Sequence, residues 1–485
     1  MDDSKGTAAS KHHVAIIGAG AGGICMAIKL REAGFRDFVM LERASEVGGT
    51  WVRNRYPGLE CDIVTSLYSF TFEQEFEWSR NFARQQEVKR YMQQCADKFG
   101  VLDHVRFNTE VTSARWDDAR SEWHLATSHG PVTAKILISA LGQFNQINVP
   151  NIPGLDSFEG QAFHTAEWPD GLDLKGKHVA VVGSAATAVQ VIPRMAEVAR
   201  HLTVFQRTAS WVLPKDIVEF SAEDWRNFKA DPSLLAALKE ESITSLEKRN
   251  PAQSKQEALN NIAVVNDPAK RAMLTPPVPI FSQRPLFSNE YYPTFNLAHV
   301  DLVQDPITKI SGRDVHTKAG VVRDVDVIIF ATGFLASKFV SAIDVVGRGG
   351  RHIKDAWKDG AEAYLGITVS GFPNLFMIYG PNTNKGSILQ MIEHEANYIA
   401  ARVSEMRDES IDWIDVRPEV LARYNEDLQH AIGEIEAWQT VGSKYYRAAS
   451  GKIVTQYPYT MARYGELTAA DTLASFEVHH EKQDA

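Results

Sequence analysis

Short apolar runs alternate with longer amphipathic stretches along this chain, which is the pattern of an α/β protein. The runs at 13–17 (HVAII) and 178–182 (HVAVV) are rich in branched residues and have the length of buried parallel strands. Each is followed by a turn of small residues, a helical stretch and a second apolar strand, at 38–41 and 202–205. Repeated β-α-β units of this kind build parallel sheets covered by helices. We therefore predict two Rossmann-like dinucleotide-binding domains.

The turn after the first strand has the spacing of a dinucleotide-binding fingerprint. Gly18, Gly20 and Gly23 lead into the helix, and Glu42 ends the second strand 24 residues after Gly18. The first glycine permits the turn, the second permits the close approach of a pyrophosphate, and the third permits packing of the helix on the strand. The helix N-terminus attracts phosphates, and a carboxylate on the second strand accepts hydrogen bonds from ribose hydroxyls. An ordinary tight turn is the alternative, but it does not require this register of strand, helix and acid.

The second unit repeats this spacing with a base in place of the acid, because Arg207 follows Gly183 by the same 24 residues. A carboxylate suits free ribose hydroxyls, whereas a guanidinium can grip a 2′-phosphate bidentately. We therefore predict FAD in the first unit and NADPH in the second, a solvated surface arginine being the alternative for Arg207. Ala185 stands at the middle glycine position, so its methyl group should push the pyrophosphate slightly outward. The residues of this turn expected to contact NADPH are Gly183, Ser184, Ala185, Thr187 and Ala188.

Two further apolar strands, at 136–142 and 326–334, end in Ala-Leu-Gly and Ala-Thr-Gly. In flavoproteins with two dinucleotide folds such strands mark the two crossings of the chain between domains, and the proline-rich stretch at 149–154 indicates the first linker. The FAD domain is then expected to be discontinuous, with the NADPH domain inserted into it. The predicted ranges are 1–145 and 336–485 for the FAD domain and 146–335 for the NADPH domain.

A helical insertion is predicted in the NADPH domain. Residues 222–261 lack strand patterning and look helical, so we expect the insertion at about 215–277. We also expect the substrate pocket to be built from loops and from this insertion, so the sequence does not identify the substrate.

Composition and charge exclude several classes of function. The net charge of −10 and the pI near 5.9 disfavour nucleic acid as a partner, because phosphate binding requires a basic face. No apolar run approaches the roughly 20 residues of a membrane span, so no membrane association is expected. The three cysteines, Cys25, Cys61 and Cys95, form no close pair, which fits a reducing, cytoplasmic location and argues against a disulfide reductase. Nothing in the sequence indicates the oligomeric state.

No metal site is expected. The histidine pairs at 12–13 and 479–480 lie in stretches that we interpret as tails. The triplet Glu-His-Glu at 393–395 lacks the i, i+4 histidine spacing of a zinc-binding helix. We interpret this triplet as part of a helix that faces partly to solvent.

Two longer patterns in the sequence are much more specific. Residues 158–169 have the form F-x-G-x-x-x-H-x-x-x-W-P, and residues 48–62 have the form G-G-x-W-x-x-x-x-Y-P-G-x-x-x-D. With these patterns the chain resembles the Baeyer–Villiger monooxygenases, a family of class B flavoprotein monooxygenases, from residue 13 to about residue 464. The resemblance implies FAD and NADPH as cofactors and the conversion of ketones to esters or lactones with dioxygen. NADPH would reduce FAD, the reduced flavin would form a C4a-peroxide, and the peroxide anion would attack the ketone carbonyl.

The resemblance also implies which residues carry out the reaction. Arg284 falls at the position of the family's catalytic arginine, and its permanent charge would stabilise the peroxide anion. Asp62, which closes the second pattern, would orient Arg284 and contact both cofactors; a loop or helix-capping carboxylate is the alternative. Gln283 replaces a lysine of the relatives, which removes one charged contact to the 2′-phosphate. Tyr445 takes the place of a tryptophan that covers the nicotinamide.

Further residues lie near the cofactors if the resemblance holds. Trp51 and Tyr68 would line the flavin, although Tyr68 is as readily interpreted as an ordinary buried aromatic. Ile388 or its neighbours would face the isoalloxazine. His164 lies on the expected interdomain linker and would couple NADPH binding to domain movement. The family positions add Gly49, Thr50, Val111, Thr208, Gln283 and Arg284 to the expected cofactor contacts.

Two other functions fit the same fold. A heteroatom oxygenase would use a protonated hydroperoxide on sulfur or amine nitrogen, and a non-oxygenating flavoprotein would keep the fold as a binding or redox-partner protein. The pattern that contains His164 and Trp168, together with Arg284, favours reaction at a carbonyl. The presence of both Arg284 and Asp62 argues against a protein that has lost oxygenation.

Overall fold

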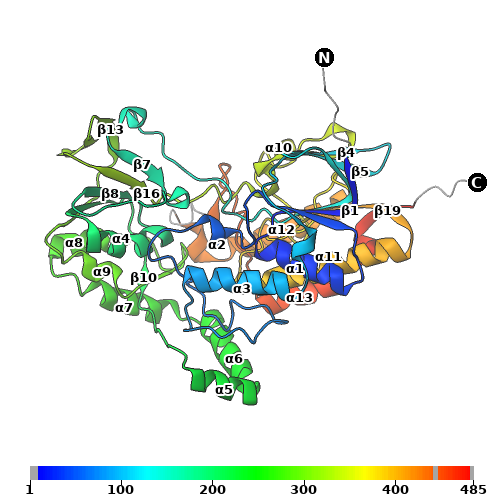
Figure 1. The fold of residues 1–485 in the computed structure, drawn as a ribbon, viewed down its shortest axis with the longest axis horizontal. Coiled ribbons are helices and arrows are strands. Elements are labelled where there is room, and N and C mark those ends of the chain that lie inside the picture. The colour runs from blue at the N-terminus through cyan, green and yellow to red at the C-terminus, as the bar shows by residue number, and fades with distance from the viewer. Residues whose placement is uncertain (1–8, 441–445, 481–485) are drawn as a thin grey trace, which may run out of the picture.

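The computed structural model of the protein describes residues 9–440 and 446–480. It contains two lobes, each built around its own sheet (Figure 1). Strands β1, β4 and β5 lie in the first lobe, and strands β7, β8 and β16 lie in the second (Figure 1). This is the α/β fold with two Rossmann-like sheets that the apolar pattern predicts.

The sheet of the first lobe runs in the order β17-β4-β5-β6-β1-β2-β3, and β18 also pairs with β6. Strands β18, β6, β1, β2 and β3 are parallel, whereas β4 and β5 form an antiparallel extension. The predicted strands at 13–17 and 38–41 are confirmed. The strands are β1 (Ser10–Ile17), β2 (Phe38–Leu41), β3 (Val105–Arg106), β4 (Val111–Asp117), β5 (Glu122–Thr127), β6 (Val132–Ser139), β17 (Asp344–Val346) and β18 (Leu375–Met377).

The sheet of the second lobe has the order β12-β9-β8-β16-β7, and every neighbouring pair in it is parallel. Its strands are β7 (Gln161–His164), β8 (His178–Val182), β9 (His201–Phe205), β12 (Val300–Val303) and β16 (Val327–Phe330). The strands expected at 178–182 and 202–205 are therefore confirmed. Beside this sheet lie an antiparallel meander and a short parallel pair, namely β13 (Ile307–Ser311), β14 (Asp314–Thr317), β15 (Val321–Val322), β10 (Val212–Leu213) and β11 (Leu286–Phe287).

Helices cover both sheets. Helix α1 (Ala21–Glu32) follows β1 and packs on α11 (Ile388–Asp408), and helix α4 (Ala186–Val198) follows β8. The other helices outside the insertion are α2 (Thr50–Arg53), α3 (Gln85–Lys98), α9 (Tyr291–Thr294), α10 (Ile353–Ala356), α12 (Pro418–Gly433) and α13 (Met461–Ala470).

The interpretation of the histidine pairs as tails is wrong. His12 and His13 belong to β1. His479 belongs to β20 (Phe476–His480), which pairs antiparallel with β19 (Ile411–Val416), and its ring stacks on Trp413 with centroids 5.1 Å apart. These histidines are therefore held by strand pairing, which depends on partners far away in the sequence.

The two crossings between the lobes lie side by side. After β6 and after β16 the chain passes from one lobe to the other, and the two segments pair backbone to backbone. Asn148 N donates to Gly333 O (2.9 Å), and Leu335 N donates to Gln146 O (2.9 Å). Because both connections form one short ribbon, a rotation of one lobe against the other bends both connections at the same place.

The helical insertion does not belong to a single lobe. Its helices are α5 (Ala222–Ala230), α6 (Ser233–Glu247), α7 (Pro251–Ile262) and α8 (Pro268–Leu274), which confirms the helical prediction. Trp225 of α5 is buried in the core of the first lobe and its Nε1 donates to Trp78 O (2.8 Å). Helices α7 and α8 instead bury Ala258 and Leu274 in the core of the second lobe. Figure 1 shows α5 and α6 at the base of the molecule, apart from α7 and α8.

Cys25, Cys61 and Cys95 are buried and carry free thiols. Across residues 9–440 and 446–480, none of the helices combines the length and the apolar character that crossing a membrane requires. In the same part of the chain, no group of three histidine, cysteine or acidic side chains is arranged to hold a metal ion.

The expectation that residues 393–395 face partly to solvent is wrong for both glutamates. The triplet lies on α11, which is packed between α1 and α13. Glu393 and Glu395 are buried, and Glu393 Oε1 accepts hydrogen bonds from Thr71 N (2.6 Å) and Thr71 Oγ1 (3.1 Å). The polar sequence of this turn therefore does not mark an exposed face.

Glu395 is 0% exposed, and burial raises its pKa to about 8. Its Oε2 accepts a hydrogen bond from Tyr379 N (2.7 Å), and its Oε1 lies 3.5 Å from the hydroxyl of Tyr464. That hydroxyl uses its single hydrogen on Leu365 O (2.6 Å), so its oxygen can accept the proton of a neutral Glu395. Tyr379 has a φ of +58°, a left-handed conformation that is uncommon for a bulky residue. The neutral carboxyl thus stabilises a strained backbone position.

Replacing Glu395 by glutamine should make the stability of the protein less dependent on pH. A carboxyl whose pKa is raised by folding stabilises the fold fully below its unfolded pKa of 4.5, and this contribution is lost as the pH rises through about 8. Glutamine does not ionise, so the apparent melting temperature of Glu395→Gln should fall less than that of the wild type between about pH 5 and about pH 9. Glu434→Gln changes an exposed glutamate and should follow the wild type. Identical pH profiles for Glu395→Gln and wild type would contradict this account.

Candidate functional site

The turn between β1 and α1 is shaped by backbone contacts that exclude side chains. Gly18 has a φ of +101°, and a Cβ atom there would lie 2.7 Å from Ala140 O, just after β6. A Cβ atom on Gly23 would lie 2.0 Å from Gly18 O, and one on Gly49 would lie 2.8 Å from Gly20 Cα. The turn, the end of β6 and the loop before α2 therefore meet backbone to backbone.

This turn has the features that a dinucleotide requires. Gly20 is the N-cap residue of α1, and no side chain caps that helix. The N–H groups of an uncapped first turn are the usual partners of a phosphate. Glu42 at the end of β2 accepts hydrogen bonds from Ala19 N (2.7 Å) and Ala44 N (2.8 Å), so its carboxylate lies against the turn. Acid, glycine loop and helix N-terminus thus come together as the fingerprint predicts.

The turn between β8 and α4 repeats this construction. Gly183 has a φ of +140°, and a Cβ atom there would lie 2.3 Å from Ala331 O. Ala331 follows β16 as Ala140 follows β6, so each nucleotide turn packs on the last residue before a crossing. Ala185 is exposed and begins α4 without a side-chain cap, while Ala188 is buried in the core of the second lobe. This turn can accommodate a second dinucleotide, with the methyl group of Ala185 at its entrance.

The residues expected at the 2′-phosphate lie at the end of β9. Ser184 Oγ donates to Thr208 O (2.6 Å), which ties the end of β9 to the turn before α4. Arg207 is exposed beside this contact, and Thr187 is half-buried in the first turn of α4. The N-terminus of α4 can bind the pyrophosphate, and Arg207 is placed at the end of β9, where the 2′-phosphate of the adenosine ribose is expected.

Trp51 of α2 and Tyr68 pack against each other. Trp51 Nε1 donates to the Tyr68 hydroxyl (2.9 Å), and the ring centroids are 5.7 Å apart and nearly perpendicular. Burial raises the pKa of Tyr68 far above its usual value, so the hydroxyl keeps its proton. Ser387 Oγ donates to Leu67 O (2.6 Å), which brings Ile388, the half-buried first residue of α11, toward Tyr68.

Thr50 and Val111 differ in exposure. Thr50 is exposed at the start of α2, whereas Val111 is buried as the first residue of β4. Thr109 N donates to Glu42 O (2.8 Å), so Val111 lies near the end of β2. Both residues therefore border the loops that surround the first nucleotide turn.

Asp62 and Arg284 form an ion pair between the lobes, with Arg284 Nη2 2.5 Å from Asp62 Oδ1. Asp62 follows α2 in the first lobe, and Arg284 precedes β11 in the second. Their side chains are 16% and 41% exposed. An ion pair this accessible contributes about 0–1 kcal/mol. The pair therefore marks where the two lobes meet and is not what holds them together.

Gln283, next to Arg284, is half-buried. Tyr445, the expected cover of the nicotinamide, lies outside the described residues.

His164 lies at the second crossing. It is 1% exposed, its Nε2 donates to Gly333 O (3.0 Å), and its Nδ1 accepts from Ala166 N (3.1 Å). These two contacts define a neutral ring, and burial lowers its pKa. The histidine of the long pattern thus connects the end of β7 to the returning chain.

Two contacts near Asp62 were not singled out from the sequence. The Tyr56 hydroxyl donates to Gln190 Oε1 (3.0 Å), and Gln190 Nε2 donates to Glu60 O (2.9 Å). Tyr56 is a fixed position of the second long pattern, so a signal for it was present. Gln190 lies on α4 without any motif, and only the packing of the lobes reveals its role.

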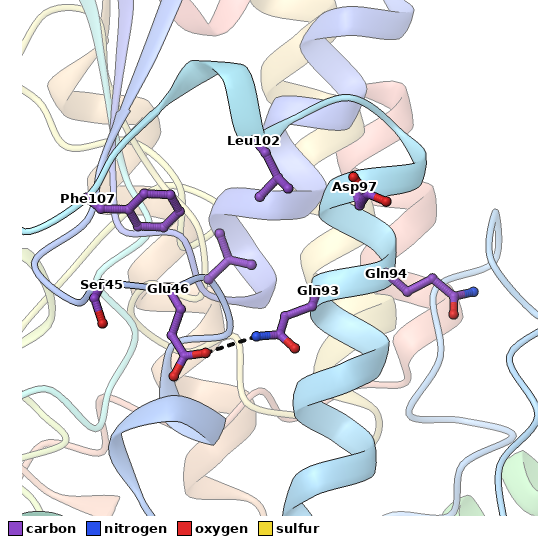
Figure 2. Close-up of a pocket in the computed structure, with 8 residues that line it drawn as sticks. Ser45, Glu46, Gln93, Gln94, Asp97, Leu102 and Phe107 are labelled. Atoms are coloured by element: carbon purple, nitrogen blue, oxygen red, sulfur yellow. Dashed lines mark hydrogen bonds between the residues drawn. The ribbon is translucent and has the colours of Figure 1, made fainter.

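A hollow of about 490 Å³ lies elsewhere on the first lobe, between α3 and the loop after β2. Figure 2 shows Gln93 of α3 pointing at Glu46, and Gln93 Nε2 donates to Glu46 Oε2 (3.0 Å). Leu102 and Phe107 form its apolar border. None of the predicted site residues lines this hollow, so we do not assign the reaction to it.

The chain is similar to known proteins over nearly its whole length. The family model described as pyridine nucleotide-disulphide oxidoreductase matches residues 15–264. A Baeyer-Villiger monooxygenase of Streptomyces coelicolor is 37% identical over 479 residues, covering 96% of this chain and 92% of the relative. Cyclohexanone monooxygenase from Rhodococcus sp. Phi1 bound to NADP+ matches with a TM-score of 0.89 and 29% identity, covering 98% of this chain and 100% of that one. OTEMO in complex with FAD and NADP matches with a TM-score of 0.87 and 29% identity, covering 96% and 99%.

These matches agree with the family that the two long patterns indicate and with the two nucleotide turns. The chain therefore belongs to the pyridine nucleotide-disulphide oxidoreductase family and, within it, to the Baeyer–Villiger monooxygenases of class B.

Proposed function

We propose that this protein is an NADPH-consuming, FAD-dependent monooxygenase that converts a ketone to an ester or lactone. The observation that carries the proposal is the Asp62–Arg284 pair at the meeting point of two lobes, each with a glycine-shaped turn and an uncapped helix. FAD held by the first lobe and reduced by NADPH supplies the activation of dioxygen. A permanent cation at the junction suits the negative charge that develops on oxygen during such a reaction.

Arg284 supplies this charge. Its guanidinium stays protonated at any relevant pH, so it can stabilise an oxyanion without gaining or losing a proton. Asp62 accepts from Arg284 Nη2 and thereby orients the guanidinium plane. Asp62 thus acts by position and not by proton transfer.

We assign the first turn to FAD. Gly20 and Gly49 leave room for a pyrophosphate beside α1, and Glu42 retains lone pairs that ribose hydroxyls can reach. Trp51 and Tyr68 border the isoalloxazine in this proposal. The proposed FAD contacts are Gly18, Gly20, Gly23, Glu42, Gly49, Thr50, Trp51, Asp62, Tyr68, Val111 and Ile388.

We assign the second turn to NADPH. Arg207 follows β9 and is exposed, so its side chain is not packed in the core of the lobe. It can therefore bind a 2′-phosphate together with Thr208. His164 acts as a positioning residue that joins the crossing to β7. The proposed NADPH contacts are Asp62, His164, Gly183, Ser184, Ala185, Thr187, Ala188, Arg207, Thr208, Gln283 and Arg284.

We also propose the domain division that the crossings suggest. Residues 1–145 and 336–485 form the FAD domain, since β17 and β18 join the sheet that contains β1. Residues 146–335 form the NADPH domain around β8. Helices α5 and α6 of the insertion then belong to the NADPH domain by sequence while they pack on the FAD domain. A cytoplasmic location, which the three unpaired cysteines favour, stays a prediction.

Gly20→Val should remove FAD without unfolding the protein. Gly20 has a φ of −79°, which any residue adopts, but a Cβ atom there would lie 3.4 Å from Gly49 Cα, so a branched side chain would fill the gap. We expect the wild type to purify yellow with equimolar FAD, and Gly20→Val to be colourless with an unchanged circular dichroism spectrum. The matched control is Ala185→Val in the second turn, which should keep its FAD and weaken NADPH binding. Full FAD occupancy in Gly20→Val would overturn the assignment of this turn.

Arg284→Ala should abolish ketone oxygenation while FAD stays bound. Loss of one preorganised group that stabilises an oxyanion costs about 10²–10³ in rate. The measurement is NADPH consumption over a panel of ketones, sulfides and tertiary amines, with products identified by mass under isotopically labelled dioxygen. Arg226→Ala, an exposed arginine on α5, is the control and should behave as wild type. Ester formation at the native rate in Arg284→Ala would refute its role, and oxygenation of sulfides or amines alone would favour the heteroatom reaction.

The enzyme should prefer NADPH over NADH, and the preference should depend on Arg207. A neutral amide at Gln283 lacks the charge-assisted part of a phosphate contact, which makes a hydrogen bond roughly twice as strong. Gln283→Lys should therefore widen the preference, and Arg207→Ala should nearly abolish it. Both effects should appear mainly in KM, because the 2′-phosphate is remote from the transferred hydride. Steady-state kinetics with both nucleotides test this, and an unchanged NADPH/NADH ratio in Arg207→Ala would show that the second unit is wrongly assigned.

A further inference from the structure

A buried cluster of charges lies directly before Asp62 in the chain. Lys215 is 3% exposed, and its Nζ is 2.5 Å from Glu60 Oε1 and 3.4 Å from Cys61 O. The other carboxylate oxygen of Glu60 pairs with Arg80, which is also buried. The ammonium of Lys215 lies over the ring of Phe82, 4.6 Å from its centroid. Two buried cations therefore share one carboxylate, and a carbonyl and an aromatic face complete the surroundings of Lys215.

The cluster joins the two lobes. Glu60 and Arg80 belong to the first lobe, whereas Lys215 follows β10, whose residues lie in the core of the second lobe. The backbone of Lys215 is fixed by Asn289, which donates from Nδ2 to Lys215 O (2.7 Å) and accepts at Oδ1 from Lys215 N (2.8 Å).

Lys215 and Arg284 both lie next to the strand pair formed by β10 and β11. Strands β10 and β11 pair in parallel, with Val212 opposite Leu286. Lys215 lies just after β10 and Arg284 lies just before β11, and both reach across to residues 60–62. Lys215 holds Glu60 and the carbonyl of Cys61, and Arg284 holds Asp62. The two cations beside the β10–β11 strand pair, Lys215 and Arg284, therefore bind three consecutive residues of the first lobe.

The Lys215–Glu60 and Asp62–Arg284 contacts differ in burial, and burial determines how strongly each can hold the two lobes in position. The Asp62–Arg284 pair is partly exposed and contributes little energy of its own. The side chains of Lys215 and Arg80 are only 1% and 9% exposed, so water screens their interaction with Glu60 less than it screens the Asp62–Arg284 pair, although the Glu60 side chain itself is 20% exposed. Losing Lys215 leaves this carboxylate with only Arg80. Of the two contacts, the one made by Lys215 is therefore the stronger constraint on where residues 60–62 lie.

We propose that Lys215 is a positioning residue for the Asp62–Arg284 pair: it sets the register of residues 60–62 against the β10–β11 strand pair and so keeps the pair in place where nucleotide and flavin meet. This inference rests on the proposed function. The Gln190 contact to Glu60 O holds the same segment independently, so the fold should survive the loss of Lys215 while the register loosens.

Lys215→Met removes the charge and keeps most of the aliphatic stem. Because a misplacement of about 1 Å can cost up to ~10²-fold in rate, we expect product formed per NADPH oxidised to fall by about 10-fold or more, with hydrogen peroxide released instead and FAD content unchanged. Lys215→Arg keeps the charge and should recover most of the product yield. The control is Lys229→Met, which breaks an exposed contact between α5 and the first lobe (Lys229 Nζ to Glu77 Oε1, 2.5 Å) and should match the wild type.

A purely structural lysine would give a different result. Native product yield in Lys215→Met, with only a lowered melting temperature, would overturn the inference, as would failure of Lys215→Arg to differ from Lys215→Met. If the wild type oxygenates no ketone, the proposed function is wrong, but the role of Lys215 can still be tested by anaerobic reduction of the flavin. In that case the rate at which NADPH reduces FAD anaerobically should fall in Lys215→Met and recover in Lys215→Arg, and an unchanged rate would overturn it.

Discussion

The Asp62–Arg284 ion pair joins two lobes that are built on separate sheets, and every function that we assign to the protein depends on those lobes meeting at this point. The pair cannot hold them there, because an accessible ion pair contributes about 1 kcal/mol at most. The position is set by other contacts: the paired crossings, the insertion that packs on both lobes, and the buried charges around Glu60. These contacts therefore determine where Arg284 lies.

The two nucleotide turns share one construction. In each, the first glycine packs on the carbonyl of the alanine that follows a strand just before a crossing, Ala140 after β6 in the first lobe and Ala331 after β16 in the second. A side chain at Gly18 or Gly183 would press directly on that crossing. The shape of each turn and the path of the chain between the lobes are therefore mechanically linked. The contact of His164 with Gly333 adds to this link at the returning crossing.

Burial gives polar residues roles that their sequence context hides. Glu395 lies in a triplet that looks like a solvated helical turn, yet it is enclosed between helices and supports the left-handed Tyr379. Lys215 looks like a loop lysine, yet it is enclosed between lobes. Both are costly to bury, and each makes a hydrogen bond to the backbone of a distant segment, Glu395 to Tyr379 N and Lys215 to Cys61 O.

The sequence by itself determined the β-α-β units, their glycine turns and the acid or base that closes each one, because strand periodicity and left-handed turns are local properties. It also pointed to Asp62 through a pattern of fixed spacing, and to Arg284 through the family resemblance. Only the tertiary structure decided that the insertion divides between the lobes, that His479 sits in a strand and that Glu395 and Lys215 are buried. Each of these depends on partners far away in the chain, and the free energy of a buried charge or a shared core is set by those partners and not by neighbouring residues.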